Sequence, residues 1–148
     1  MSITIVDGNL FDTSAKYICH QVNCCGRMGS GVAKQVRSLY PEAYKEYMDK
    51  CKDQSGVLGD SQFILCHDGK VIVNMFAQGN YGYDGKLYTD YSAFQNCLIK
   101  IRDNIPVGES IAMPYKIGCG LGGGDWNKVL SIITSELDGQ YVVELWRI

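Results

Sequence analysis

The chain has 148 residues, of which 46% are hydrophobic and 20% charged, and its formal net charge at pH 7 is -2. A chain of this length and composition can bury a core without disulfides or metal ions, and we expect one domain over residues 1–148. The scattered basic residues exclude long nucleic acid as the main partner, because binding to a phosphate backbone normally needs a clustered basic face.

Six segments dense in β-branched, aromatic or other apolar residues are predicted as strands. They cover residues 3–6, 17–22, 62–66, 71–76, 110–113 and 141–146. Segments of helical period alternate with them and cover residues 31–37, 42–50, 91–102 and 126–137. This alternation along the whole chain predicts an α/β layered fold.

Residues that favour helix starts mark the limits of three of the predicted helices. The first helix is expected to end near Pro41, whose fixed φ angle suits the first turn of the second helix. Asp90 and Asp125 stand directly before the third and fourth helices, where a carboxylate can accept hydrogen bonds from the free N–H groups of the first turn. We therefore expect both residues to be N-caps.

The sequence shows no sign of export or of a metal site. Its first residues, MSITIVDGN, lack the basic start and apolar stretch of a signal peptide, and no apolar run is long enough to span a membrane. Seven cysteines form an odd set without a CxxC pair, which we interpret as reduced core residues. We expect a cytoplasmic monomer with no metal, cofactor or membrane partner.

Two glycine-rich segments, residues 23–33 and 118–126, each follow a predicted strand and precede a predicted helix. Glycine lets the backbone approach a ligand, and the free N–H groups at a helix start favour an anion. For the first segment a simple turn is an equal alternative. The second has five glycines in the seven positions 118–124, and so costly a composition favours a phosphate-binding loop. Neither segment fits the P-loop or Rossmann pattern.

Three groups of residues taken together resemble the macrodomain family. They are residues 6–11 near the start, residues 20–23 with 28–33 around the first glycine segment, and residues 113–114 with 117–121 around the second. They cover nearly the whole chain in the family's order. The resemblance implies a three-layer α/β/α sandwich with a central mixed sheet. It is strongest to the compact branch that includes ADP-ribose-1″-phosphate phosphatases and hydrolases that remove terminal ADP-ribose from glutamate.

The resemblance also implies an ADP-ribose site. The family usually has an Asp for adenine where this chain has Asn9, an amide that can both donate and accept. Asn23 matches the residue that contacts the distal ribose, and both glycine segments would hold the diphosphate and the distal ribose through backbone N–H groups. The expected ligand contacts are Gly8, Asn9, Leu10, His20, Asn23, Met28, Gly29, Ser30, Gly31, Val32, Pro114, Ile117, Gly118, Cys119, Gly120, Leu121, Gly122, Gly123 and Gly124.

The expected catalytic residues are His20, Asp84 and Asp125. His20 matches a histidine of the phosphatase branch and can act as acid or base, although a buried strand histidine that only hydrogen-bonds has equal weight. Asp84 lies in a loop where it can orient water, or it is a solvated turn residue. Asp125 caps its helix, acts near the substrate, or does both.

The glutamate-specific hydrolases have a Lys after the strand equivalent to residues 71–76 and an Asp after the Gly-Cys-Gly-Leu run, whereas this chain has Gln78 and Gly122. A route through a lysyl nucleophile is therefore not expected.

Three functions stay open. They are hydrolysis of an ADP-ribose derivative, with ADP-ribose-1″-phosphate as the first choice, ADP-ribose binding without turnover, and removal of ADP-ribose from a protein or nucleic acid. The expected partners are ADP-ribose or a derivative, and in the third case ADP-ribosylated macromolecules.

Overall fold

The computed structural model describes residues 2–53 and 57–148, and within them six strands form one sheet. The strands are β1 (Ile3–Asp7), β2 (Tyr17–Asn23), β3 (Ser61–Leu65), β4 (Val71–Gln78), β5 (Ser110–Pro114) and β6 (Val142–Arg147). Their order across the sheet is β1-β6-β5-β2-β4-β3. Only the β3–β4 pair in this part of the chain is antiparallel, so the sheet is mixed, as expected.

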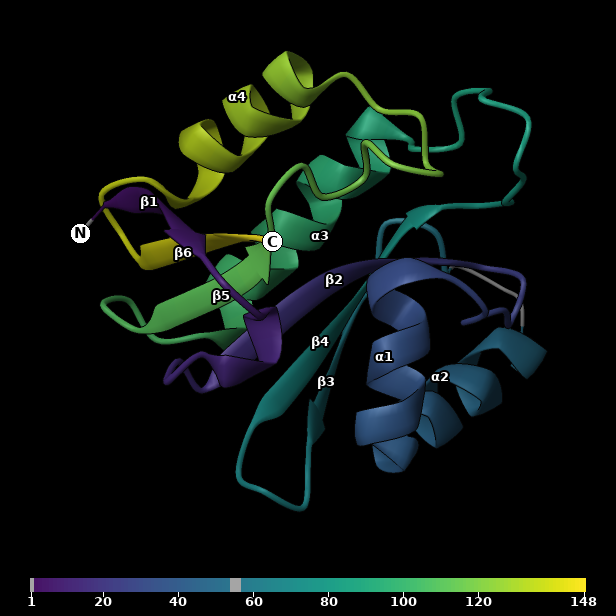
Figure 1. Ribbon diagram of the computed structural model, residues 1–148, viewed down its shortest axis with the longest axis horizontal. Coiled ribbons are helices and arrows are strands. Elements are labelled where there is room, and N and C mark those ends of the chain that lie inside the picture. Colours follow the sequence, from purple (N-terminus) through teal and green to yellow (C-terminus); the bar gives the residue numbers. More distant parts are fainter. Residues whose placement is uncertain (1, 54–56) are drawn as a thin grey trace.

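Four α-helices and one 3-10 helix complete the described fold. They are α1 (Gly31–Leu39), α2 (Pro41–Asp53), α3 (Tyr91–Asn104), α4 (Trp126–Leu137) and η1 (Leu10–Asp12). Figure 1 shows α3 and α4 over one face of the sheet and α1 and α2 over the other. This confirms the three-layer α/β/α sandwich, and every predicted strand and helix is present with limits that differ by three residues or fewer.

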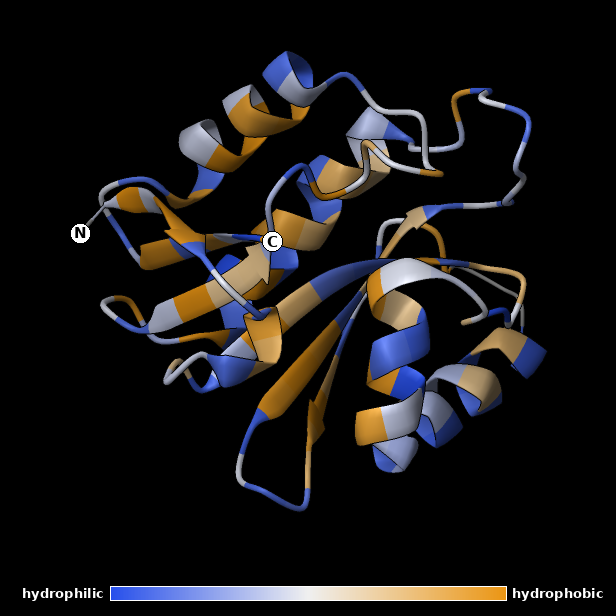
Figure 2. Ribbon diagram, in the orientation of Figure 1, coloured by the Kyte–Doolittle hydropathy of each residue, from blue (hydrophilic) through white to orange (hydrophobic). Residues whose placement is uncertain are grey.

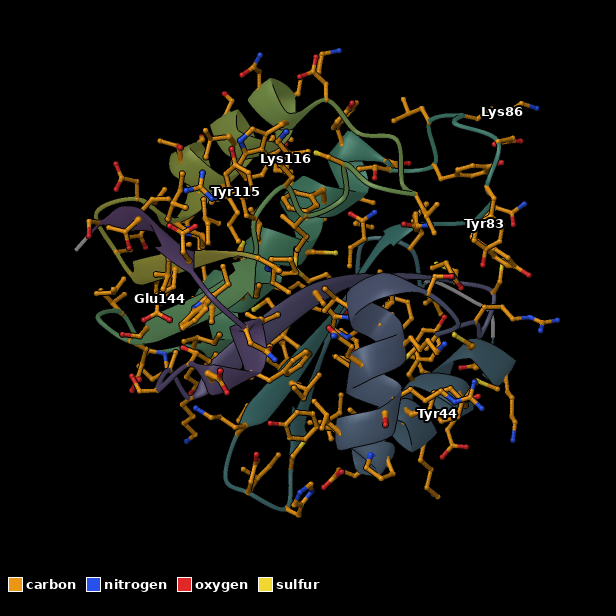
Figure 3. All side chains as sticks on the ribbon, in the orientation of Figure 1. Tyr44, Tyr83, Lys86, Tyr115, Lys116 and Glu144 are labelled. Carbon is orange, nitrogen blue, oxygen red and sulfur yellow. The ribbon has the colours of Figure 1, made fainter. Side chains whose placement is uncertain are left out.

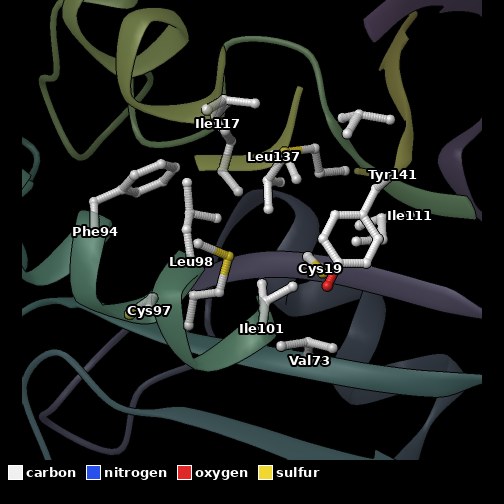
Figure 4. Packing of buried hydrophobic residues seen from close by; sticks show 14 of the residues in the cluster. Cys19, Val73, Phe94, Cys97, Leu98, Ile101, Ile111, Ile117, Leu137 and Tyr141 are labelled. Atoms are coloured by element: carbon white, nitrogen blue, oxygen red, sulfur yellow. The ribbon is translucent and has the colours of Figure 1, made fainter. Parts of the chain in front are cut away.

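The side chains of the central strands pack against both helical layers. On β2, Cys19 faces the layer of α3 and α4, whereas Ile18 faces the layer of α1 and α2. Figure 4 shows Cys19 and Val73 packed beneath Leu98 and Ile101 of α3. Strand β4 is buried from Val71 to Ala77, as expected for a strand covered on both faces. Figure 2 shows the hydrophobic colour on the first half of β4, whereas β2 turns to the hydrophilic colour in its second half.

The helix caps are formed as predicted. Asp90 accepts a hydrogen bond from the N–H of Ala93 at 2.9 Å, and Asp125 accepts one from the N–H of Asn127 at 2.9 Å. Pro41 is the first residue of α2. Each cap satisfies an N–H group that has no acceptor inside its own helix, and this fixes where α3 and α4 begin.

All seven cysteines are free thiols. Cys19, Cys51, Cys66 and Cys97 are buried, which agrees with their interpretation as core residues, whereas Cys25 is exposed on the first glycine segment and departs from it. None of the helices in the described residues combines the length and hydropathy needed to cross a bilayer.

The parallel strands end at one edge of the sheet. Strand β2 leads there into the first glycine segment and α1, and β5 leads into the second glycine segment and α4. Ligands of open α/β sheets bind outside the carboxyl ends of the strands, because loops from several strands meet there with helix N-termini. The fold therefore brings the two glycine segments to one edge.

Candidate functional site

A cleft of about 490 Å³ opens at this edge, between the first glycine segment with the start of α1 and the second glycine segment. Its size is that of a pocket for a small organic ligand. The expected ligand contacts that line it are His20, Asn23, Gly29, Ser30, Gly31, Val32, Pro114, Ile117, Gly118, Gly120, Leu121 and Gly122. Residues from β2, α1 and the segment after β5 thus meet around one space.

The other expected contacts lie outside the lining of this cleft. They are Gly8, Asn9, Leu10, Met28, Cys119, Gly123 and Gly124. Asn9 is exposed and caps η1, because its side-chain oxygen accepts from the N–H of Phe11 at 2.9 Å. Its amide nitrogen stays available for a ligand. Met28 is 1% exposed and packs in the core under α2.

Asn23 organises the first glycine segment. Its side-chain oxygen accepts from the N–H of Cys25 at 3.0 Å and from the hydroxyl of Tyr47 at 2.8 Å. Its amide group donates to the carbonyl oxygen of Arg27 at 2.8 Å. These bonds close the turn after β2, so Asn23 shapes the cleft wall that it also lines.

Gly118, Gly122 and Gly124 of the second segment have no room for a side chain. A Cβ atom on Gly118 would lie 2.8 Å from Oε1 of Gln21, and one on Gly122 would lie 2.6 Å from Oγ1 of Thr89. A Cβ atom on Gly124 would lie 2.7 Å from the carbonyl oxygen of Gly118. Contacts with the Gly118 carbonyl oxygen require glycine at positions 122 and 124, and the φ angle of +77° favours it at Gly118, with or without a ligand.

The second segment is also tied to the loop between β4 and α3. The carbonyl oxygen of Gly122 accepts from the N–H groups of Tyr88 and Thr89 at 2.7 and 2.9 Å. The hydroxyl of Thr89 donates to the carbonyl oxygen of Gly118 at 2.7 Å. A Cβ atom on Gly123, whose φ angle is +71°, would collide with the carbonyl oxygen of Lys86. The backbone of the second segment is thus held in one conformation.

Three glycines differ from these because they face open space. A Cβ atom on Gly29, Gly31 or Gly120 would meet no described atom within 4 Å, and all three residues line the cleft. Within residues 2–53 and 57–148, the N–H groups of Gly29, Ser30, Gly31, Gly120 and Leu121 have no intramolecular acceptor. Free N–H groups on two facing walls form an anion site without requiring charged side chains.

The charged side chains that line the cleft are Arg27 and Lys116, and no carboxylate stands among the described lining residues. Lys116 has a φ angle of 58°, in the left-handed region that a side chain rarely adopts. Such strain persists where the surrounding structure imposes it, often at a functional site. Although the whole chain carries a net negative charge, the cleft has the electrostatics of an anion site.

His20 is the one expected catalytic residue that lines the cleft. The side chain is buried, and its Nε2 lies 2.5 Å from Oδ1 of Asn74. Burial lowers the pKa of the ring to about 4, against the smaller opposing effect of the bond to Asn74. The ring is therefore neutral near pH 7 and is suited to accept or donate hydrogen bonds, not to act as a cation.

Asp84 and Asp125 lie outside the cleft lining. The carboxylate of Asp84 accepts from the hydroxyl of Tyr88 at 2.9 Å and from the N–H of Lys86 at 3.2 Å, and these bonds hold its pKa below the usual range. Asp125 is exposed and caps α4. Both side chains have structural roles that account for their positions.

Several lining residues were missed by sequence reasoning. They are Gln21, Val22, Arg27, Ala33, Gln78, Tyr81, Gly82, Tyr83, Tyr115 and Lys116. The amide of Gln21 donates to Oε1 of Gln78 at 2.7 Å and to Thr89 at 2.8 Å. The hydroxyl groups of Tyr83 and Ser30 lie 2.9 Å apart and join the β4–α3 loop to the start of α1. Figure 3 shows Tyr83 on that loop and Tyr115 and Lys116 on the segment after β5. The position of Gln21 and Gln78 at the ends of neighbouring strands is the signal that could have identified them.

The comparisons with known proteins agree with this geometry. The Macro domain family model matches residues 19–133. The chain is 32% identical over 132 residues to the DNA ADP-ribosyl glycohydrolase of Mycobacterium tuberculosis, a match that covers 86% of this chain and 36% of the relative. It therefore spans about a third of the length of that relative.

Two further similarities cover nearly the whole chain. An ADP-ribose 1″-phosphate phosphatase of Lodderomyces elongisporus is 24% identical over 148 residues, which covers 90% of this chain and 91% of the relative. The solved macrodomain of Mycobacterium tuberculosis DarG superposes with a TM-score of 0.76 at 27% identity and covers 97% of each chain. The similarity thus includes both glycine segments and the strands that lead to them.

Proposed function

This chain belongs to the Macro domain family, and on that premise we propose that it binds ADP-ribose in the cleft and hydrolyses ADP-ribose-1″-phosphate to ADP-ribose and phosphate. The observation that carries the proposal is the composition of the cleft wall. Residues of both glycine segments whose N–H groups lack an acceptor line the cleft together with Arg27 and Lys116, and no carboxylate of the described residues lines it. A ligand with several phosphates fits this set, because amides and cations hold phosphate oxygens.

The chemistry needs no cofactor. Water attacks the phosphorus atom and the bond between phosphorus and the ribose oxygen breaks. One proton of the water ends on that ribose oxygen and the other stays on the released phosphate. Phosphoryl transfer passes through a loose transition state in most analyses, so catalysis depends mainly on positioning and on stabilising charge. The N–H groups and the two cations of the cleft supply both.

The test is phosphate release from ADP-ribose-1″-phosphate. We expect His20→Ala to lower the rate by about tenfold or more, because His20 lines the cleft and phosphoryl transfer depends on how the ligand is positioned. His67→Ala is the matched control, because His67 is the other histidine and lies on the exposed β3–β4 turn. Equal rates for the wild type and both variants would remove His20 from the mechanism. Calorimetry that finds ADP-ribose binding without any turnover would make the chain a binding module.

A second candidate function is removal of ADP-ribose from nucleic acid, and the rim of the cleft supports it. Tyr81 and Tyr83 line the cleft, are exposed, and stand edge to face with their ring centroids 6.5 Å apart. Exposed aromatic rings bind unpaired bases by stacking. Release of ADP-ribose from a modified single-stranded oligonucleotide, reduced by Tyr83→Ala and retained by Tyr83→Phe, would support this function, and no release would exclude it.

Whichever bond is cleaved, we propose a route without a lysyl nucleophile. Gln78 is the last residue of β4 and stands where the glutamate-specific hydrolases have lysine, and its side-chain oxygen accepts from Gln21. Trapping of a covalent adduct between a lysine and ADP-ribose would contradict this.

The free thiols fit a reducing compartment, so we place the activity in the cytoplasm.

A further inference from the structure

Three polar side chains form a ladder across neighbouring strands beneath the cleft. His20 on β2 lies directly opposite Asn74 on β4, and Asn74 lies directly opposite Gln62 on β3. Residues in register point to the same face of a sheet, so the three side chains share the face covered by α2. Asn74 is fully buried between the other two.

Hydrogen bonds link the ladder from end to end. The amide of Gln62 donates to the carbonyl oxygen of Glu46 at 2.9 Å. The amide of Asn74 donates to Oε1 of Gln62 at 3.0 Å and to the carbonyl oxygen of Ala43 at 3.4 Å. Oδ1 of Asn74 then faces Nε2 of His20 at 2.5 Å.

The backbone of α2 fixes the direction of this chain of bonds. The carbonyl oxygens of Glu46 and Ala43 can only accept, so the amide nitrogens of Gln62 and Asn74 must point toward them. Their oxygens then point the opposite way, along the ladder. Because Oδ1 of Asn74 can also only accept, Nε2 of His20 must carry the proton.

The other ring nitrogen is left as an acceptor. With the proton on Nε2, Nδ1 of the neutral ring has a free lone pair, and no group in the described residues donates to it. His20 is 1% exposed, yet it lines the cleft. A buried acceptor without a donor is unfavourable, and a ligand that supplies a donor relieves this cost. Phosphate oxygens cannot do so, because they are acceptors themselves.

We propose that Gln62 and Asn74 are positioning residues that hold His20 as the Nε2–H tautomer, and that Nδ1 accepts a hydrogen bond from a hydroxyl of the distal ribose. The identity of the ligand rests on the proposed function, whereas the tautomer does not. The backbone N–H groups bind the phosphates and His20 recognises the sugar, so the two kinds of ligand group meet different walls of the cleft.

The experiment is nitrogen NMR of the histidine rings in the free protein and with ligand. The chain has two histidines, so labelling histidine gives two ring spectra. His67 is an internal reference, because it is exposed and its Nδ1 lies 2.7 Å from the carboxylate of Glu42. We expect His20 of the free protein to be the Nε2–H tautomer near pH 7. An Nδ1–H tautomer would overturn the proposal.

Titrations with two different ligands distinguish this proposal from the proposed function. ADP-ribose should shift Nδ1 of His20, whereas ADP, which lacks the distal ribose, should leave it unchanged. Equal shifts with both ligands would place the donor elsewhere and overturn the proposal. Shifts of the Gly29 and Gly120 amides without a change at Nδ1 would keep ADP-ribose as the ligand and remove the contact with His20. If these amides do not respond to ADP-ribose, the proposed function and the ribose contact both fail, and the tautomer is still decided by the free protein.

A variant series tests the positioning role. In Asn74→Leu the ring loses its acceptor, so we expect Nδ1–H to appear and the affinity for ADP-ribose to fall about 2- to 10-fold, the effect of one neutral hydrogen bond. The affinity for ADP should not change. Gln62→Met is the milder variant if Asn74→Leu does not fold, because Gln62 is only partly buried. Without the oxygen of Gln62 as an acceptor, the side-chain amide of Asn74 can rotate and no longer fixes the His20 tautomer. An unchanged tautomer in a folded variant would refute the role of that residue.

Discussion

Alanine at Gly120 and alanine at Gly122 should affect different properties, although the two positions are two residues apart. Both residues line the cleft and neither has a positive φ angle, so alanine fits the backbone at each. A Cβ atom on Gly120 would meet no described atom, whereas one on Gly122 would lie 2.6 Å from Oγ1 of Thr89 and 2.7 Å from the carbonyl oxygen of Gly118.

The expected magnitudes follow from these contacts. Gly122→Ala forces the second segment away from Thr89, and overpacking of this kind costs about 1–3 kcal/mol. For a chain of this size that lowers Tm by roughly 3–10 °C. Gly120→Ala leaves Tm unchanged or slightly raised, because alanine restricts the unfolded chain. Its methyl group occupies space beside the free N–H groups and displaces the diphosphate. Loss of one hydrogen bond to a charged group, about 1.5–3 kcal/mol, weakens ADP-ribose binding roughly 10- to 100-fold.

Thermal unfolding and calorimetric titration with ADP-ribose measure the two effects separately. Gly29→Ala is a second test of the same idea, because Gly29 also faces open space from the opposite wall. If Gly120→Ala binds ADP-ribose as tightly as the wild type, the second segment does not contact the diphosphate. If Gly122→Ala keeps the wild-type Tm, the packing of this segment against Thr89 does not stabilise the fold as described.

Three further predictions concern other residues. Lys116→Gly should raise stability by about 0.5–1 kcal/mol in thermal unfolding, because glycine tolerates the left-handed φ angle, and should weaken ADP-ribose binding more at low than at high salt. Asp125→Ala should cost about 1 kcal/mol of stability through loss of the cap and leave phosphate release unchanged, and a loss of turnover would restore Asp125 as a candidate catalytic residue. Burial lowers the pKa of His20 from 6.5 to about 4, so the unfolded chain binds this proton more tightly. Stability should therefore fall as the pH drops through this window, and His20→Leu should flatten the decline in Tm between pH 6.5 and 4.

The fold was predictable because its signals are local. Strand β4 is indicated by a run of β-branched and other apolar residues that only Asn74 interrupts before Gln78, and α4 by apolar residues at helical spacing with Asp125 at the cap. The largest differences are at helix ends, where α2 continues to Asp53 beyond its predicted limit. Helix ends are the least certain part of such a prediction because the last turn depends on packing as much as on propensity.

The site was predictable only in part, because its remaining contacts join distant parts of the chain. Gln21 bonds to Gln78 at a separation of 57 residues, and Ser30 pairs with Tyr83 at a separation of 53. No spacing rule relates such residues, and only the order of the strands brings them together. Both glycine segments could be identified from the sequence, since each follows a strand and precedes a helix within a few residues.

The glycine content of the second segment has a physical meaning that composition cannot reveal. From the sequence alone we assign the five glycines to a ligand, but the packing and the backbone conformation already demand glycine at positions 118, 122, 123 and 124. Thr89 bonds to Gly118, and its N–H together with that of Tyr88 bonds to Gly122, so the segment is ordered before a ligand arrives. The conformational entropy of this segment is therefore lost when the protein folds. Ligand binding does not require a second loss of that entropy. A loop built in this way can hold a diphosphate through backbone N–H groups, because Gly120 and Leu121 line the cleft and their N–H groups have no acceptor within the described residues.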